Sequence, residues 1–138
     1  TIPWLGFCEI ITLSAKKGSY VNKLKESLKK TILVRSKKVG TSTLNKTVGA
    51  LVDRNPIALA GSKGARFKIK YASMLKAAPP TILLFSNQSK GIPENFKRYL
   101  KKGIRNEYKL INTPIHLIFR TSADIEKRLQ KSVRKSVK

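Results

Sequence analysis

From residue 40 onward, the spacing of apolar residues switches between a helical period and a strand period. The order is helix, strand, strand, helix, strand, helix, with Pro79-Pro80 between the first two strands and Thr113-Pro114 before the third. Three short strands cannot bury their apolar sides alone, so they need helices packed against them. The pattern predicts an α+β fold in which short antiparallel strand pairs form a three-stranded sheet with helices on one face.

The first strand of this sheet is predicted at residues 66–72, and the second at residues 81–85. In the first, Phe67, Ile69 and Tyr71 alternate with basic residues. Successive side chains of a strand point to opposite faces of the sheet. We therefore expect these three apolar residues on the buried face and a basic outer face.

Residues 93–106 have the clearest helical pattern. Pro93 suits the first helical position, and Glu94 lies in the first turn, where the helix dipole favours negative charge. Phe96, Leu100 and Ile104 recur on one side of this helix. The opposite half of the helix carries five cations, namely Lys97, Arg98, Lys101, Lys102 and Arg105.

A charge-rich helix face is usually only a solvated face, but this chain has few acids to neutralise it. Its 138 residues include 30 Lys and Arg against 7 Asp and Glu, a formal net charge of +23. We therefore interpret the basic face as a phosphate-binding surface. Tyr99 shares the apolar side of the helix and is predicted in the core. Tyr108, just beyond it, is the better candidate for stacking on a base.

The excess of positive charge favours a polyanionic partner, nucleic acid before an anionic membrane. No apolar run approaches the roughly 18 residues of a membrane span, and the N-terminus does not resemble a signal peptide. We expect a cytoplasmic protein without a membrane partner, and the single cysteine, Cys8, fits that compartment. One Cys and one His exclude a zinc cluster, and the scattered acids suggest no acid/base dyad.

The first 38 residues have a different pattern. Residues 5–13 are almost continuously apolar, which is typical of a strand covered on both faces. A turn and a predicted helix at 20–34 follow. A strand, a turn and a helix form half of an α/β unit, so we expect a remnant of a larger sheet that ends near residues 36–40. At the other end of the chain, Thr121 and Asp124 resemble a capping box that opens a last helix.

Six motifs occur in a set order: TSTLN (41–45), KIKYA (68–72), PPT (79–81), FSN (85–87), RYL (98–100) and TPIHLIFR (113–120). In this order they resemble the C-terminal KH-like domain of the Der/EngA family, bacterial GTPases with two tandem G domains that work in ribosome assembly. The resemblance covers residues 7–120. It departs from the family at Leu75, where the usual YATQ string is absent, and at Asn112, which replaces the Gly that usually precedes Thr113.

The resemblance also gives a meaning to Ser14, Ala15 and Lys16. They match the fifth GTPase motif, in which the alanine amide contacts the guanine carbonyl. The phosphate-binding string GxxxxGK[ST] and the base-reading string Asn-Lys-x-Asp do not occur in this sequence. The resemblance implies GTP and Mg²⁺ as cofactors of the parent protein. Because both strings are missing, this chain is expected to hold no cofactor and to hydrolyse no GTP.

The resemblance implies three parts. Residues 1–38 correspond to the last strand and helix of a P-loop GTPase domain, residues 39–122 to the KH-like domain, and residues 123–138 to a basic extension. The extension adds Lys131, Arg134 and Lys135 to the expected ribosome contacts. A GxxG string at residues 61–64 precedes a strand instead of joining two helices, and we interpret it as a flexible turn.

Two functions remain open at this point. The first is an RNA- and ribosome-binding regulatory domain that acts in large-subunit biogenesis. Its partners would be ribosomal RNA, the large subunit and the G domains of its own chain. The second is a protein-docking domain that packs on the G domains and relays their nucleotide state without contacting RNA.

Overall fold

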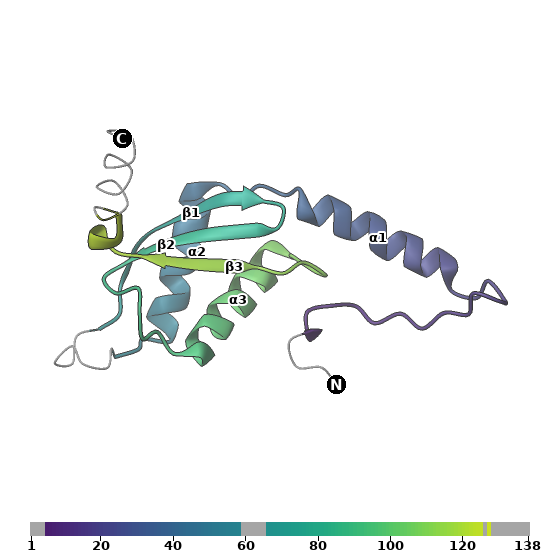
Figure 1. Ribbon diagram of the computed structural model, residues 1–138, viewed down its shortest axis with the longest axis horizontal. Coiled ribbons are helices and arrows are strands. Elements are labelled where there is room, and N and C mark those ends of the chain that lie inside the picture. The colour runs from purple at the N-terminus through teal and green to yellow at the C-terminus, as the bar shows by residue number, and fades with distance from the viewer. Residues whose placement is uncertain (1–4, 59–65, 126, 128–138) are drawn as a thin grey trace, which may run out of the picture.

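The computed structural model describes residues 5–58, 66–125 and 127. Its helices and strands are α1 (Val21–Arg35), α2 (Thr41–Arg54), β1 (Ile69–Ala77), β2 (Pro80–Ser86), α3 (Glu94–Tyr108) and β3 (His116–Arg120). Helix α1 extends away from the body that the sheet forms with α2 and α3 (Figure 1). No helix in the described part of the chain is long and apolar enough to cross a membrane.

The sheet has the order β1-β2-β3. Strand β1 is antiparallel to β2, as predicted, but β3 runs parallel to β2, so the prediction of antiparallel pairs was wrong for the second pair. The physical reason is α3, which connects β2 to β3 as a crossover and returns the chain to the end of the sheet where β2 began. The α+β fold with helices on one face is confirmed.

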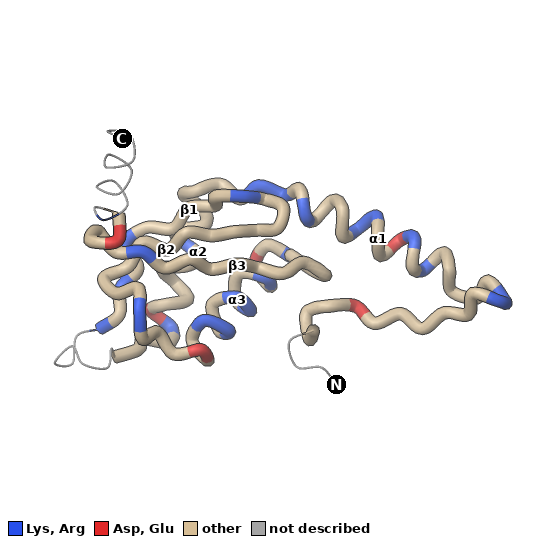
Figure 2. The backbone as a smooth tube through the Cα atoms, in the orientation of Figure 1, with Lys and Arg blue, Asp and Glu red and all other residues tan. Residues whose placement is uncertain are grey.

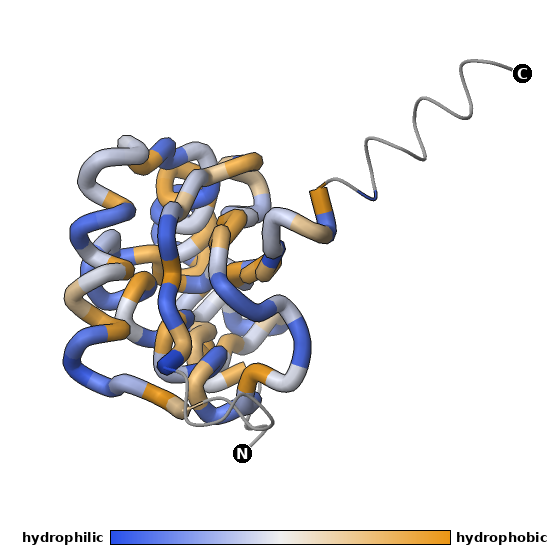
Figure 3. The backbone as a smooth tube through the Cα atoms, turned by 90° about the vertical axis from the view of Figure 1, so that its left-hand side faces the viewer, coloured by the Kyte–Doolittle hydropathy of each residue, from blue (hydrophilic) through white to orange (hydrophobic). Residues whose placement is uncertain are grey.

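The core lies between the sheet and the two helices. Ala72, Ile82 and Leu84, one from β1 and two from β2, are fully buried on the helix-facing side. The apolar stripe of α2 and the predicted apolar stripe of α3 pack against them. Their most buried members are Leu44, Val48, Phe96, Leu100 and Ile104. Figure 3 shows the resulting alternation of hydrophobic and hydrophilic residues along the packed elements.

Tyr71 does not share the buried face with Phe67, contrary to the prediction. A register irregularity in β1 separates the pairs Ile69–Ser86 and Tyr71–Phe85. One extra residue in a strand moves the following side chains to the other face of the sheet. Phe67 is therefore 2% exposed, whereas Tyr71 is 47% exposed.

The N-terminal segment also differs from the prediction. Residues 5–13 form no strand, because a strand requires a neighbour for its backbone hydrogen bonds and the described residues offer this segment none. Ile10 is consequently 81% exposed. The predicted helix after the turn is confirmed as α1, although Leu28 and Ile32 on its apolar stripe are also exposed.

Candidate nucleic-acid interface

Helix α3 positions the predicted basic face. Its buried side is a row of Phe96, Leu100, Ile104 and Tyr108, spaced four residues apart. Side chains with this spacing lie above one another on a helix, so the row fixes the rotation of α3 against the core. The remaining side of the helix consequently points away from the core.

All five predicted cations of α3 avoid the buried row. Arg98 and Lys102 are exposed, while Lys97, Lys101 and Arg105 are half-buried. Figure 2 shows these basic positions following one another along α3. The structure therefore brings together the α3 residues that the sequence singled out.

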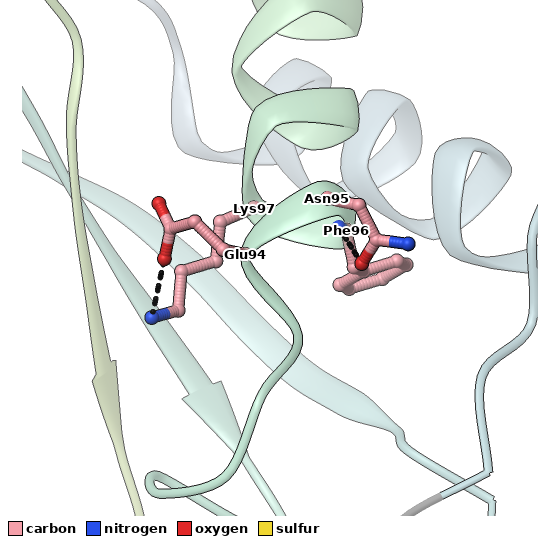
Figure 4. A network of polar contacts seen from close by, with 4 residues as sticks. All are labelled: Glu94, Asn95, Phe96 and Lys97. Carbon is pink, nitrogen blue, oxygen red and sulfur yellow. Dashed lines mark hydrogen bonds and ion pairs between the residues drawn. The ribbon is translucent and has the colours of Figure 1, made fainter.

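Lys97 differs from its neighbours because it is paired. Its Nζ lies 3.1 Å from the Glu94 carboxylate, one turn earlier (Figure 4). The hydrogen bond from Lys97 lowers the pKa of Glu94 below its ordinary value. Both side chains are partly exposed, and an exposed pair of this kind contributes little to stability. Lys97 mainly neutralises the carboxylate nearest to the basic face.

Arg105 also differs, because the N-terminal segment covers it. Its guanidinium carbon lies 4.5 Å from the centre of the Phe7 ring. Its Nη2 donates a weak hydrogen bond of 3.4 Å to the Thr113 carbonyl, and its Nε is buried without a hydrogen-bond partner among the described residues. This burial lowers the pKa of Arg105. Arg105 is thus partly committed to internal packing.

An open cleft of about 730 Å³ runs along the basic face. Helix α3 contributes Arg98, Lys101, Lys102 and Arg105 to it, residues 114–116 form a second wall, and Gly6 and Phe7 lie at its margin. Among the described residues that line it, the single carboxylate is Glu94, which is paired with Lys97. A cleft of this composition attracts phosphate groups.

The other predicted site residues lie elsewhere. Ser14, Ala15 and Lys16 form a turn before the start of α1 that is remote from the sheet (Figure 1). The Ser14 amide donates to the Ser19 carbonyl across this turn, at 3.3 Å. The structure does not bring these residues to α3. Lys131, Arg134 and Lys135, together with the GxxG string at 61–64, lie outside the described residues.

The prediction of Tyr108 as a stacking residue was wrong. Tyr108 is 8% exposed, and its hydroxyl shares a 2.7 Å hydrogen bond with Thr47 of α2. It is buried because α3 continues through residue 108 and presents this side chain on its buried row. Tyr99 packs against the core as predicted, and its hydroxyl donates to the Leu51 carbonyl at 3.0 Å.

The described part of the chain holds no group of three His, Cys, Asp or Glu side chains that could bind a metal ion. Its lone histidine, His116, is exposed where β3 begins, beside the cleft. Sequence reasoning did not assign His116 to the cleft. No periodicity could have revealed it, because its position depends on the register of the sheet.

Residues 38–120 match the family model described as the KH-domain-like part of EngA bacterial GTPase enzymes, C-terminal. The chain is 32% identical over 123 residues to the GTPase Der of Dinoroseobacter shibae, covering 89% of this chain and 25% of the relative. It is 33% identical over 117 residues to the GTPase Der of Geobacter metallireducens, covering 85% of this chain and 26% of the relative. A GTPase Der from Levilactobacillus brevis is 34% identical over the same length, with the same coverage.

The chain thus spans about a quarter of the length of the curated relatives it matches. The matched region contains α2, α3 and all three strands, and hence both walls of the basic cleft. This chain belongs to the Der/EngA family of bacterial GTPases and comprises their C-terminal KH-like domain.

Proposed function

We propose that this chain is an RNA-binding module that contacts ribosomal RNA of the large subunit through the outward face of α3. The observation that carries the proposal is the cleft in which four cations of α3 converge and in whose described lining the single carboxylate is already paired. Family membership supports a role as a module of a GTPase, and the resemblance to Der/EngA supports cytoplasmic ribosome assembly as the process in which the parent protein acts. GTP and Mg²⁺ are proposed for the parent protein only.

Three of the cations are suited to bind phosphates. Arg98, Lys101 and Lys102 are spaced i, i+3 and i+4, so they lie on one side of the helix within little more than one turn. Lys97 and Arg105, in contrast, already contact other residues of the chain: Lys97 is paired with Glu94, and Arg105 lies over the Phe7 ring. An RNA backbone that binds to the three cations would displace counterions, which makes the affinity depend strongly on salt.

The test changes Arg98, Lys101 and Lys102 to Glu. Binding to large-subunit ribosomal RNA should weaken strongly, and the slope of log affinity against log salt should flatten by roughly 0.7 to 0.9 for each phosphate that is no longer bound. The melting temperature should stay nearly unchanged because the three side chains lie off the buried row. Wild-type affinity in a folded variant would contradict the proposal.

A matched control separates a local contact from the general charge of the chain. Lys25, Lys29 and Lys30 are three exposed cations on α1. Changing them to Glu alters the net charge by the same amount as the α3 variant. The proposal requires the α3 variant to lose far more affinity than this control, and equal losses would show that only the overall charge matters.

The alternative function, docking on the G domains, is supported by a different surface. Leu28, Ile32 and Leu33 of α1 are between 53% and 72% exposed, and a helix rarely presents so many apolar side chains to water. This surface is separate from the cleft along α3, so the two functions are tested independently. Changing Leu28 and Leu33 to Gln should weaken docking on the G domains without changing the salt slope of RNA binding.

A further inference from the structure

The outer face of the sheet, opposite α2 and α3, is a regular grid of side chains. The registers of the two strand pairs define three rows across β1, β2 and β3. Partners in one row point to the same face of the sheet. The rows are Tyr71–Phe85–Arg120, Ser73–Leu83–Ile118 and Lys76–Thr81–His116.

No member of this grid is buried. The core side chains of the same strands, Ala72, Ile82 and Leu84, alternate with the grid and face the helices. Among the described residues, the grid is therefore an uncovered surface with an apolar centre. Leu75, in the second irregularity of β1, adds another exposed apolar side chain beside it, at 54% exposure.

The first row combines two aromatic rings with an arginine. Tyr71 is 47% exposed, and Phe85 and Arg120 are half-exposed. Neighbouring strands lie about 4.8 Å apart, so the three side chains form one short platform across the sheet. Aromatic rings and guanidinium planes on an open sheet are the groups on which unpaired bases stack.

The charge of the sheet is consistent with a nucleic acid. Strands β1, β2 and β3 carry four basic or imidazole side chains, Lys70, Lys76, His116 and Arg120, and no Asp or Glu. Three of the four belong to the rows at the two ends of the grid. A ligand with apolar flat groups and regularly spaced negative charges matches this distribution.

The grid is also continuous with the cleft along α3. His116 belongs to the third row of the grid and lines that cleft as well. A strand of RNA that contacts Arg98 and Lys101 in the cleft therefore meets the edge of the grid at β3 without leaving the protein surface.

We propose that the outer face of the sheet binds single-stranded RNA, with bases stacked on Tyr71 and Phe85 and phosphates held by Arg120 and Lys76. This inference rests on the proposed function, since it names the form of RNA that the module takes. The cleft on α3 supplies phosphate contacts only, whereas the grid supplies the contacts to bases. Duplex RNA hides its bases and would gain nothing from the aromatic row.

The test compares two fluorescent probes with the full chain, a 12-mer of uridine and an abasic 12-mer of equal charge. Tyr71→Ala should lower the affinity for the uridine 12-mer by about five- to 150-fold, the effect of losing one stacked base. It should leave the affinity for the abasic 12-mer unchanged. Tyr71→Phe keeps the ring and should restore binding of the uridine 12-mer.

Tyr20→Ala is the matched control, because Tyr20 is 67% exposed but lies before α1, away from the sheet. It should bind both probes as the wild type does. Ultraviolet crosslinking of a 4-thiouridine 12-mer should place the crosslinks in β1 and β2. The proposal is overturned if Tyr71→Ala and Tyr20→Ala behave alike, if both probes lose affinity equally, or if the crosslinks avoid the sheet.

Failure of this inference is distinguishable from failure of the proposed function. Loss of ribosomal RNA binding in the α3 variant with normal uridine binding in folded Tyr71→Ala would overturn the stacking platform alone. Unchanged RNA binding in both variants would overturn the proposed function as well.

Discussion

The side-chain oxygen of Asn112 accepts a 2.6 Å hydrogen bond from the backbone amide of Glu9, 103 residues earlier in the chain. The Asn112 amide nitrogen donates to the hydroxyls of Ser27 and Thr31 in α1, each at 3.2 Å, and its backbone N–H donates to the Phe7 carbonyl. One side chain therefore ties the N-terminal segment and α1 to the loop before β3.

Asn112→Gly should release this attachment without straining the backbone. Asn112 has a φ of 54°, a left-handed conformation that Gly adopts at no steric cost. The substitution removes the three side-chain hydrogen bonds and should raise the hydrogen-exchange rate of the Glu9 amide. It should leave the exchange of β2 amides unchanged. An unaltered hydrogen-exchange rate of the Glu9 amide would show that other contacts hold the N-terminal segment.

Substitution by Ala should have opposite effects on the free energy of unfolding at two glycines in helices. A Cβ on Gly103 of α3 would lie 2.5 Å from Cδ2 of Leu51, a core residue of α2, whereas a Cβ on Gly49 would meet no atom within 4 Å. Gly103→Ala should lower the free energy of unfolding by about 1 to 3 kcal/mol through overpacking. Gly49→Ala should raise it by up to about 1 kcal/mol through helix propensity. Urea unfolding of both variants measures the difference, and equal effects would contradict the close approach of α2 and α3.

Asn45 should be one of the most sensitive polar residues. Its side-chain oxygen accepts the Ala72 amide at 2.7 Å, and its nitrogen donates to the Ala72 carbonyl at 2.9 Å. The Asn45 side chain thereby pairs with the backbone N–H and C=O of one β1 residue, as a neighbouring strand would. Asn45→Ala should cost about 1 to 3 kcal/mol of the free energy of unfolding, because both partly buried groups of Ala72 lose a partner. Asn45→Asp keeps the acceptor but loses the donor, so it should lower the melting temperature. A melting temperature equal to that of the wild type would contradict this role.

Asp124 should titrate with a midpoint near 2. Hydrogen bonds from the Thr121 amide, the Ser89 hydroxyl and the Thr121 hydroxyl lower its pKa from 3.8 to about 2. The predicted capping box is confirmed, because the Thr121 amide donates to the Asp124 carboxylate at 2.9 Å and the Asp124 amide donates to the Thr121 hydroxyl at 3.3 Å. A depressed pKa stabilises the fold above the unfolded value of 3.8, and this contribution is lost as the pH falls toward 2. An NMR titration should show the midpoint rising when Ser89 and Thr121 are changed to Ala. A titration midpoint of Asp124 near 3.8 in the wild type would contradict the hydrogen bonds of this capping box.

The positions and faces of the helices were available from sequence because they depend on local spacing. Phe96, Leu100 and Ile104 recur with the period of one helix, and whatever core forms, they must lie on the same side of α3. The cations between them then have to face outward, so the direction of the basic face could be predicted from spacing alone. The family was likewise readable, because its motifs are short strings in a set order.

Tertiary structure decided which strands are neighbours and how they are aligned. Residues 5–13 have the composition of a buried strand but form none without a partner strand. Tyr71 alternates perfectly with Phe67 in sequence, yet an irregularity in the pairing with β2 turns it outward. Tyr108 lies beyond the predicted end of its helix, yet α3 continues through residue 108 and packs this side chain against α2, where it is hydrogen-bonded to Thr47.

The sequence by itself determined an α+β KH-like module with a basic helix, because those features follow from periodicity, charge and motif order within short segments. Only the tertiary structure decided that Phe7 covers Arg105, that Asn112 joins three distant segments, and that Tyr71, Phe85 and Arg120 share one row. These contacts depend on the register of β1 against β2 and on the path of the chain between α3 and β3. Pairings between distant residues leave no periodic trace in a single sequence, so no local pattern could have specified them.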